Sequence, residues 1–321
     1  MNSTLSPLLS PLPAGFSTNT SGSIWGWYNT KNLAVLPGNF NRTSKVEHII
    51  SFPPDTNHEA ACFVEATNQL FFAAWGFDHS WQYVLDVDTN ELHNITTDPP
   101  TWNAHGCVYY NGSLHVATDG GGAGAGYHAS IVKIDPKTLK AETLLNNFYQ
   151  QPFLGFNDLD IDPNGNIWIT DSISAWWVFQ TKGNANGIAF AEDGTLYVDS
   201  TGISSGRPNV KDPFKTRALL AYDTRDGQPQ LRNERLFSNS ISYYCDGVRV
   251  SRNGLVFCGA GDGIDVIEPK NGITLGRIRT GGGDPIDAAV NLAFDGHTLW
   301  VVGHGGVWKA SGINELLTRK W

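Results

Sequence analysis

The chain has 321 residues, of which 17% are Asp, Glu, Lys or Arg, and its formal net charge is −9. An acidic chain without basic clusters argues against nucleic acid and against membrane surfaces as partners. No apolar run in the sequence approaches the length that spans a bilayer, and the first residues lack the basic region of a signal peptide. Glycosylation triplets that would permit secretion occur at Asn2, Asn19, Asn41, Asn94 and Asn111, so the compartment stays open.

A hairpin pattern recurs along the chain and predicts the fold. Each copy has a polar or small residue, an apolar strand, a polar turn and a second strand, and the copies begin at Glu59, His105, Asn157, Asn186, Asp246 and Ala289. Most copies are followed by a further apolar strand that ends in an acidic residue and a turn. A hairpin with two outer strands is one four-stranded blade. The repeat therefore predicts an all-β, six-bladed β-propeller.

One interval of the repeat is short. Only 29 positions separate Asn157 from Asn186, which is too few for a four-stranded blade. We therefore predict a shortened third blade, with an exposed sheet edge or apolar patch near Trp176 and Trp177. Residues 1–24 are predicted to form an N-terminal tail. Residues 25–321 are predicted to form a single propeller domain that the N-terminal strands close.

Polar residues stand at the start of most inner strands. In a propeller these positions lie near the axis at one end, so Glu59, His105, Asn157, Asn186 and Asp246 are expected to meet. Four of them offer carboxylate or amide oxygens, which hard cations prefer. The pattern predicts one divalent metal ion, with Ca²⁺ favoured and Zn²⁺, Mg²⁺ or Mn²⁺ as alternatives. Taken singly, an Asn or Asp before Gly is also an ordinary turn residue, and a purely structural channel lining remains an alternative.

Two other features of the sequence are predicted to carry no chemistry. Cys62 and Cys107 lie inside apolar strands and are interpreted as buried free thiols. The glycine-rich run that starts at Asp119 does not precede a helix and lacks a phosphate-binding Lys, so it is interpreted as a flexible loop.

Several stretches together resemble the gluconolactonase/regucalcin-like six-bladed propellers, and within them the fungal lactonohydrolases, over about residues 45–310. The stretches include His58-Glu59-Ala60-Ala61, Asn157-Asp158-Leu159, Asn186-Gly187-Ile188-Ala189-Phe190 and Cys245-Asp246-Gly247-Val248. The resemblance implies metal ligands at Glu59, Asn157, Asn186 and Asp246. It also implies a substrate-contacting Asn in the second blade, and that position falls on His105 here. Asn103, two residues earlier, is expected to point the same way and to bind substrate with His105.

These residues and the resemblance predict a metal-dependent lactone hydrolase whose substrate is a small hydroxylated or secondary-metabolite lactone. Asp246 would bind the metal and take a proton from water, and His105 would stabilise the oxyanion or shuttle a proton. Two alternatives stay open, because a fold does not determine a function. One is a non-hydrolytic biosynthetic propeller enzyme, an isomerase, a cyclase or a strictosidine-synthase-like enzyme. The other is a non-catalytic binding propeller that Ca²⁺ stabilises.

Overall fold

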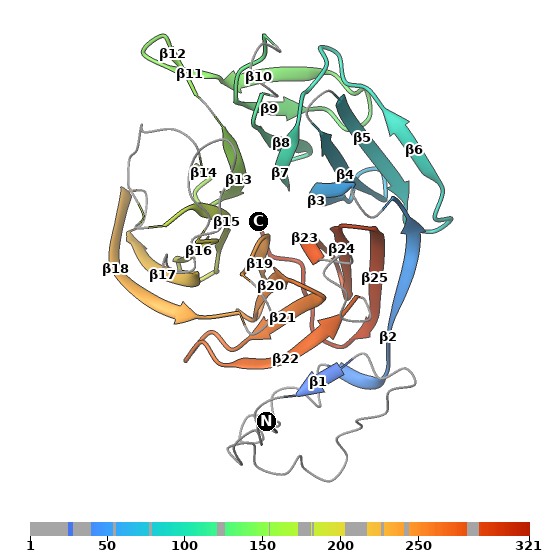
Figure 1. Ribbon diagram of the computed structural model, residues 1–321, viewed down its shortest axis with the longest axis vertical. Coiled ribbons are helices and arrows are strands. Elements are labelled where there is room, and N and C mark those ends of the chain that lie inside the picture. Colours follow the sequence, from blue (N-terminus) through green and yellow to red (C-terminus); the bar gives the residue numbers. More distant parts are fainter. Residues whose placement is uncertain are drawn as a thin grey trace, which may run out of the picture.

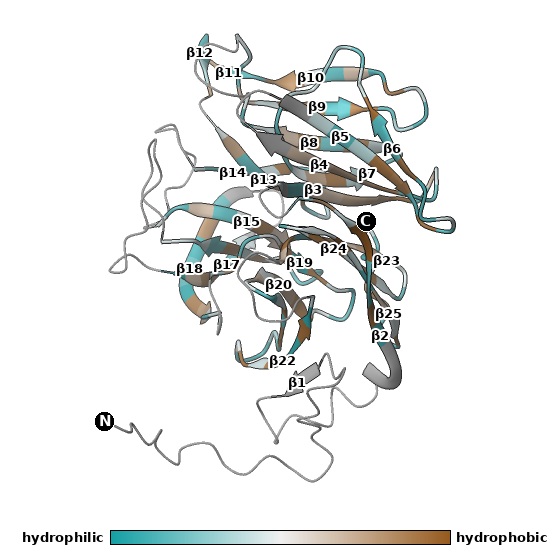
Figure 2. Cartoon of the chain, turned by 45° about the vertical axis from the view of Figure 1, so that its right-hand side comes forward, coloured by the Kyte–Doolittle hydropathy of each residue, from teal (hydrophilic) through white to brown (hydrophobic). Residues whose placement is uncertain are grey.

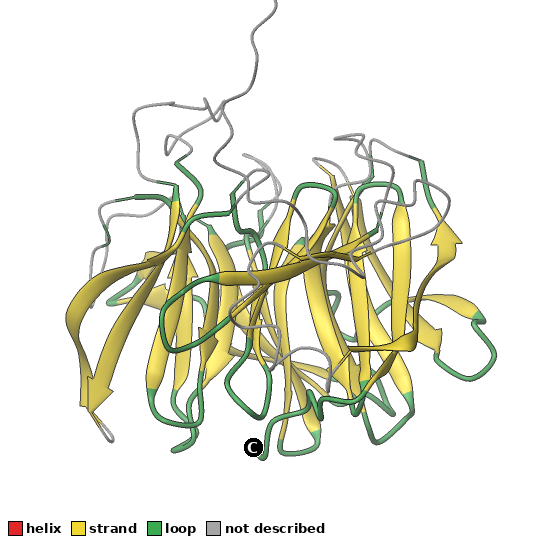
Figure 3. Cartoon of the chain, turned by 90° about the horizontal axis from the view of Figure 1, so that it is seen from below, coloured by secondary structure: helices red, strands yellow, loops and turns green. Residues whose placement is uncertain are grey.

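The computed structural model shows sheets that stand side by side around a central axis (Figures 1 and 3). It describes residues 25–27, 40–53, 56–76, 79–120, 126–153, 155–172, 181, 183–202, 217–225, 228–240, 244–280 and 289–321. These residues form strands and loops and contain no helix. Accordingly, no helix of the described part is long and apolar enough to cross a membrane.

Five antiparallel sheets of four or five strands form blades, and each blade is named here by its innermost strand. The β3 blade contains β3 (Asn57–Val64), β4 (Gln69–Gly76), β5 (His79–Asp86) and β6 (Leu92–Ile95). The β7 blade contains β7 (Ala104–Tyr110), β8 (Ser113–Thr118), β9 (Ser130–Ile134) and β10 (Ala141–Leu145). The β15 blade contains β15 (Ala185–Phe190), β16 (Thr195–Ser200), β17 (Ala218–Arg225) and β18 (Gln228–Ser238).

The last two blades incorporate strands from the start of the chain. The β19 blade contains β19 (Val248–Val250), β20 (Val256–Ala260), β21 (Gly263–Ile267), β22 (Thr274–Arg279) and, at its outer edge, β1 (Trp25–Trp27). The β23 blade contains β23 (Ala289–Asp295), β24 (Thr298–Gly303), β25 (Gly306–Ile313) and, at its outer edge, β2 (Phe40–Ser51). The boundary between a tail at 1–24 and a domain at 25–321 stays a prediction.

The propeller fold is confirmed, but the count of six blades is not. The sheet between the β7 and β15 blades has two described strands, β13 (Phe156–Ile161) and β14 (Ile167–Asp171). A small hairpin of β11 (Asn147–Phe148) and β12 (Gln151–Pro152) leads into it. The inner strands still contact one another in a closed ring, in the order β3, β7, β13, β15, β19 and β23. Trp176 and Trp177, the expected exposed patch, lie outside the described residues.

The inner hairpins form where the repeat predicts them. Each predicted hairpin corresponds to one antiparallel pair, namely β3–β4, β7–β8, β13–β14, β15–β16, β19–β20 and β23–β24. The turn between β7 and β8 shows the local reason. Asn111 and Gly112 both have positive φ, at 47° and 78°, as a two-residue hairpin turn with right-handed strand twist requires.

Apolar side chains fill the spaces between neighbouring sheets. Leu70, Phe71 and Phe72 are each 0% exposed, because both faces of β4 pack against an adjacent blade. Hydrophobic stretches also run along β23 and β24 (Figure 2), where Trp300 is fully buried. Continuous apolar runs between turns are typical of strands that are covered on both faces.

The interpretation of Cys62 and Cys107 as free thiols is wrong. They form a disulfide between β3 and β7, with their Cα atoms 5.7 Å apart. The two strands face each other across one apolar cluster between adjacent blades, a proximity that the sequence separation of 45 residues conceals. A second disulfide joins Cys245 and Cys258.

Two arginines lie along the axis deeper than the starts of the inner strands, and we call this region the floor. Arg249 on β19 donates to Asp158 Oδ2 at 3.0 Å and to the Cys107 carbonyl at 3.2 Å, so its side chain links three inner strands. Arg319 donates from both terminal nitrogens to the two carboxylate oxygens of Asp160, each at 2.6 Å. The C-terminus lies at the centre of the ring in Figure 1.

Candidate active site

The end of the axis where the inner strands start, which we call the mouth, collects residues at or near those starts. Glu59 lies in β3, Asn186 near the start of β15, and Asp246 two residues before β19. The side chain of Asn186 donates a hydrogen bond to Asp246, and the charges of Asp246 and Glu59 repel each other. The structure therefore brings these three predicted residues together.

Glycine permits this close approach. Gly187 follows Asn186 within strand β15, and a Cβ there would clash with the carbonyl oxygen of Asp246. Only glycine lets β15 and the segment before β19 come so near. The Asn-Gly pair at 186–187 is therefore part of a strand at a tight contact and does not form a turn.

The position of Asn157 relative to the other mouth residues is shown less directly. It is half-buried near the start of β13 and precedes Asp158, whose charge acts on both Glu59 and Asp246. Its position therefore borders the mouth. Its role as a metal ligand stays a prediction.

The mouth carboxylates are only partly compensated, because burial and neighbouring acids outweigh the effects of Arg249 and Asn291 on the pKa of Glu59. Burial, followed by repulsion from Asp246, holds the pKa of Glu59 well above its ordinary range. Burial, followed by repulsion from Asp158, raises the pKa of Asp246 to about 7, although the hydrogen bond from Asn186 opposes this shift. A buried carboxylate keeps its charge only if an opposite charge or hydrogen bonds compensate it. The mouth therefore favours either protonation or a cation.

Asp199 on β16 belongs to the mouth and was missed from the sequence. It is 1% exposed, and its Oδ1 accepts a hydrogen bond from the backbone N–H of Asn186 at 3.1 Å. Burial and then the charge of Asp246 hold its pKa well above the usual range. The repeat argument considered only the first residues of inner strands, whereas Asp199 lies at the end of a second strand.

Asn291 was also missed. From β23, its Nδ2 donates to Glu59 Oε2 at 3.2 Å and to the His105 carbonyl at 3.4 Å. In the sixth hairpin it aligns with Gly187 and Asp158, one position after the other mouth residues, because Leu292-Ala293-Phe294 matches Ile188-Ala189-Phe190. The repeat argument considered only the first polar position of each hairpin, which Val290 occupies here, and so passed over Asn291.

His105 lies in β7 at the mouth and is 7% exposed. Its Nε2 lies 3.4 Å from Asp119 Oδ2, and the Asp119 backbone N–H donates to the Asn103 carbonyl at 3.2 Å. Asp119, interpreted from sequence only as the start of a loop, is therefore the acidic neighbour of His105.

The expectation that Asn103 follows the strand alternation of His105 is wrong. Strand β7 begins at Ala104, its register shifts before Gly106, and Asn103 has a φ of +47°. The side chain of Asn103 is nevertheless buried, and its Oδ1 has no hydrogen-bond partner among the described residues. Asn103 Oδ1, two residues before His105 in the chain, therefore remains able to accept a hydrogen bond.

The donor set at the mouth fits a hard divalent cation. Asp246 Oδ1 and Asp199 Oδ2 are buried and, within the described part of the chain, accept no hydrogen bond. Carboxylate and amide oxygens are the ligands that Ca²⁺ prefers. No described group of three or more His, Cys, Asp or Glu side chains is placed to hold a metal. The predicted set differs from such a group because it combines only two carboxylates, Glu59 and Asp246, with two amides.

The disulfide between Cys245 and Cys258 anchors the segment that carries Asp246. Cys245 directly precedes Asp246 and is 4% exposed, and Cys258 lies in the centre of β20. The Asp246 backbone N–H also donates to the Gly259 carbonyl at 2.8 Å. Asp246 is thus fixed to the second strand of its own blade from two sides.

Fold and site together define an all-β propeller with an acidic mouth at one end of its axis. No protein-family model matches the chain. Lactonohydrolase oryL of Aspergillus oryzae is 30% identical over 342 aligned residues, which cover 92% of this chain and 76% of that protein. Lactonohydrolase oryH of the same organism is 26% identical, over 79% of this chain and 74% of the relative.

Solved structures share the architecture. A gluconolactonase from Xanthomonas campestris superimposes with a TM-score of 0.69 at 19% identity, covering 87% of this chain and 92% of the other. Regucalcin from Agrobacterium tumefaciens, a calcium-binding protein, superimposes with a TM-score of 0.60 at 15% identity, covering 85% and 94%. The chain therefore belongs to the gluconolactonase/regucalcin-like propeller family, together with the lactonohydrolases.

Proposed function

We propose that this protein is a metal-dependent lactone hydrolase acting on a small hydroxylated or secondary-metabolite lactone. The observation that carries the proposal is the mouth itself, where buried carboxylates are only partly compensated in a chain related to lactonohydrolases. Glu59, Asn157, Asn186 and Asp246 would hold one divalent cation, with Ca²⁺ favoured by the oxygen ligands. When bound, such a cation supplies Lewis-acid polarisation of a carbonyl and neutralises the carboxylates.

Asp246 is the proposed general base. Its buried Oδ1 has no hydrogen-bond partner among the described residues and could accept a proton. The hydrogen bond from Asn186 and the disulfide at Cys245 hold this carboxylate in place. It would take a proton from the water that attacks the lactone carbonyl.

His105 would face the substrate and not the cation, because imidazole is a poor ligand for hard, oxygen-preferring ions. Asp119, 3.4 Å away, would orient the imidazole, which would stabilise the oxyanion or pass a proton to the leaving alkoxide. Asn103 would add a hydrogen bond to the bound lactone. We also propose that β13 and β14 are the remnant of a sixth, shortened blade, since β13 occupies one position in the ring of inner strands.

A panel of lactones tests the proposal directly. Acid release is measured for sugar lactones and alkyl lactones, with and without chelator, and after addition of Ca²⁺, Zn²⁺, Mg²⁺ or Mn²⁺. We expect hydrolysis that the chelator abolishes and one of the cations restores. Hydrolysis that is unchanged in chelator would contradict the metal, and the absence of hydrolysis with every lactone would contradict the activity.

A further inference from the structure

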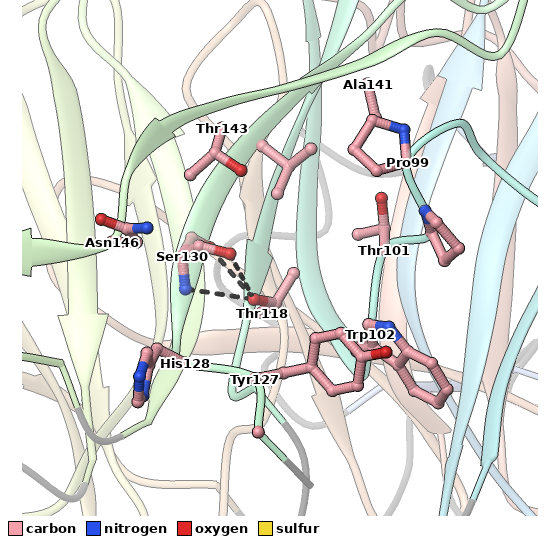
Figure 4. Close-up of a pocket in the computed structure, with 13 residues that line it drawn as sticks. Pro99, Thr101, Trp102, Thr118, Tyr127, His128, Ser130, Ala141, Thr143 and Asn146 are labelled. Carbon is pink, nitrogen blue, oxygen red and sulfur yellow. Dashed lines mark hydrogen bonds between the residues drawn. The ribbon is translucent and has the colours of Figure 1, made fainter.

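A separate cavity lies on the β7 blade, beside the mouth and without any of the predicted metal ligands (Figure 4). Its volume is about 220 Å³. Thr118 at the end of β8 and Ser130 at the start of β9 form its centre, and Thr143 on β10 and Asn146 lie on its outer side. The cavity therefore opens at the end of the sheet where the inner strand β7 begins.

One wall of this cavity is aromatic. The rings of Trp102 and Tyr127 are stacked, with centroids 4.4 Å apart and an interplanar angle of 25°. Tyr127 is 48% exposed, so part of its ring remains free for contact with a ligand. Trp102 Nε1 is buried and has no hydrogen-bond partner among the described residues. Buried donors in folded proteins are normally bonded, so this N–H points to a missing acceptor.

The cavity selects for a neutral ligand. Its 13 lining residues include His128 but no Asp, Glu, Lys or Arg, which argues against a phosphate or an amine as the ligand. The central hydroxyls of Thr118 and Ser130 already bond each other at 3.0 Å. The volume is below the roughly 300–1,000 Å³ of sites for drug-sized ligands. A single small ring with one acceptor oxygen matches these properties.

The cavity and the mouth adjoin. Trp102 directly precedes Asn103, and Thr118 directly precedes Asp119, the neighbour of His105. Adjacent strands are about 4.8 Å apart, so a cavity over β8 to β10 lies roughly 5–15 Å from the inner strand. A ligand of ordinary size can therefore occupy both places at once.

We propose that this cavity is a specificity subsite that holds a neutral ring substituent of the substrate, with an oxygen of that substituent accepting a hydrogen bond from Trp102 Nε1. As a subsite of a lactone it rests on the proposed function. The preferred substrates are then lactones that carry a ring beyond the lactone itself, and bare lactones are poorer substrates.

Two variants and a control test the subsite. Thr143→Phe places a ring in the cavity, and Trp102→Phe removes the donor while keeping an aromatic wall. Tyr149→Asn is the matched control. Tyr149 lies a few residues after Thr143 in the chain, is 86% exposed and does not line the cavity. Its φ of +49° is one that Asn tolerates. Circular dichroism confirms that each variant is folded.

The first readout is binding, which needs no activity. Acetophenone, a neutral ring with one acceptor oxygen, is titrated against the full-length protein by saturation-transfer NMR. We expect wild type and Tyr149→Asn to bind equally, Thr143→Phe to lose at least tenfold in affinity, and Trp102→Phe to lose roughly two- to tenfold, the value of one hydrogen bond. Failure of wild type to bind, or equal binding by Thr143→Phe, overturns the subsite.

The second readout is kinetic. kcat/KM is measured for δ-valerolactone and for its 4-methoxyphenyl derivative. We expect Thr143→Phe to lower the ratio of the substituted to the unsubstituted lactone at least tenfold, whereas Tyr149→Asn leaves the ratio unchanged. An unchanged ratio in Thr143→Phe overturns the subsite. If acetophenone binding behaves as expected but no lactone is hydrolysed, the cavity stands as a ligand site and the proposed lactonase function fails.

Discussion

The mouth and the floor of the propeller axis are built from the same inner strands, but among the described residues only the floor carboxylates form ion pairs with arginines. At the floor, Asp158 pairs with Arg249 and Asp160 with Arg319, although Asp158 adjoins the mouth and its charge also acts on the carboxylates there. At the mouth, Glu59, Asp199 and Asp246 lie close enough to repel one another, and no described arginine or lysine forms an ion pair with them.

This difference suggests that the floor carboxylates have a structural role and the mouth carboxylates a functional one. In a buried ion pair each charge has a partner within the protein, so the floor pairs link strands without needing a ligand. A buried group of like charges costs stability, and a protein retains such a group where it performs chemistry or binds a counter-ion. We therefore propose that the mouth is the reactive end of the axis.

The largest expected effect comes from removing the proposed base. Asp246→Asn keeps the shape of the side chain but cannot accept a proton, so we expect kcat/KM for a hydrolysed lactone to fall about 10²–10⁴-fold. In chelator the unfolding midpoint should stay the same or rise, because the charge repelling Glu59 and Asp199 is gone. Lactone kinetics and thermal melts measure the two effects. A large loss of stability with intact activity would place Asp246 among the structural carboxylates.

The floor should show the reverse pattern. Arg249→Met leaves Asp158 buried without its partner, and we expect the free energy of unfolding to fall by about 3–5 kcal/mol. The double variant with Asp158→Asn should recover much of this loss, because the buried charge is then removed. Urea denaturation measures both. Equal losses in the single and double variants would mean that the pair does not carry the stability assigned to it.

Stability should depend on pH through the mouth. The folded-state pKa of Asp246, about 7, exceeds its ordinary value. The folded protein therefore binds more protons than the unfolded chain between about pH 4 and 7, so stability falls as pH rises through that window. We expect thermal melts in chelator to show this decline and added Ca²⁺ to reduce it, because a cation compensates the charges. A decline that Ca²⁺ leaves unchanged would show that the cation does not bind among these carboxylates.

The smallest expected effect concerns substrate choice. His105→Asn introduces the residue that the family resemblance implies at this position. We expect cation affinity to stay near normal and the preference for simple sugar lactones over other lactones to rise on the order of tenfold, the value of one well-placed hydrogen bond. Competition assays with paired lactones and calcium titration measure these outcomes. Loss of the cation, or unchanged preferences, would show that His105 has another role.

Local patterns made the fold predictable. Alternating apolar strands and turns such as Asn111-Gly112 specify hairpins within about twenty residues, so all the inner hairpins could be predicted. Because Glu59, Asn186 and Asp246 hold equivalent positions in the repeat, their proximity could also be predicted. The blade count was less predictable, because the short segment after Asn157 breaks the repeat.

Pairing between side chains far apart in the sequence was not predictable, because the strand and repeat periodicities do not specify which distant residues pair. Arg319 and Asp160 are 159 residues apart, and nothing in either segment indicates the other. The bond between Cys62 and Cys107 depends on which blades are adjacent and on which faces they share. Asp199 and Asn103 owe their positions to a strand end and to a left-handed backbone conformation, which strand alternation does not predict.

Calorimetric titration of the chelator-treated protein with Ca²⁺ tests the contrast between the two ends most directly. The same change from Asp to Asn is made at each end, as Asp246→Asn at the mouth and Asp160→Asn at the floor, with Glu59→Gln as a second mouth variant. We predict one binding site per chain in wild type and in Asp160→Asn, and at least a hundredfold weaker binding in both mouth variants. Binding that survives in the mouth variants, or that is lost equally in Asp160→Asn, would contradict the assignment of the mouth as the cation-binding, reactive end.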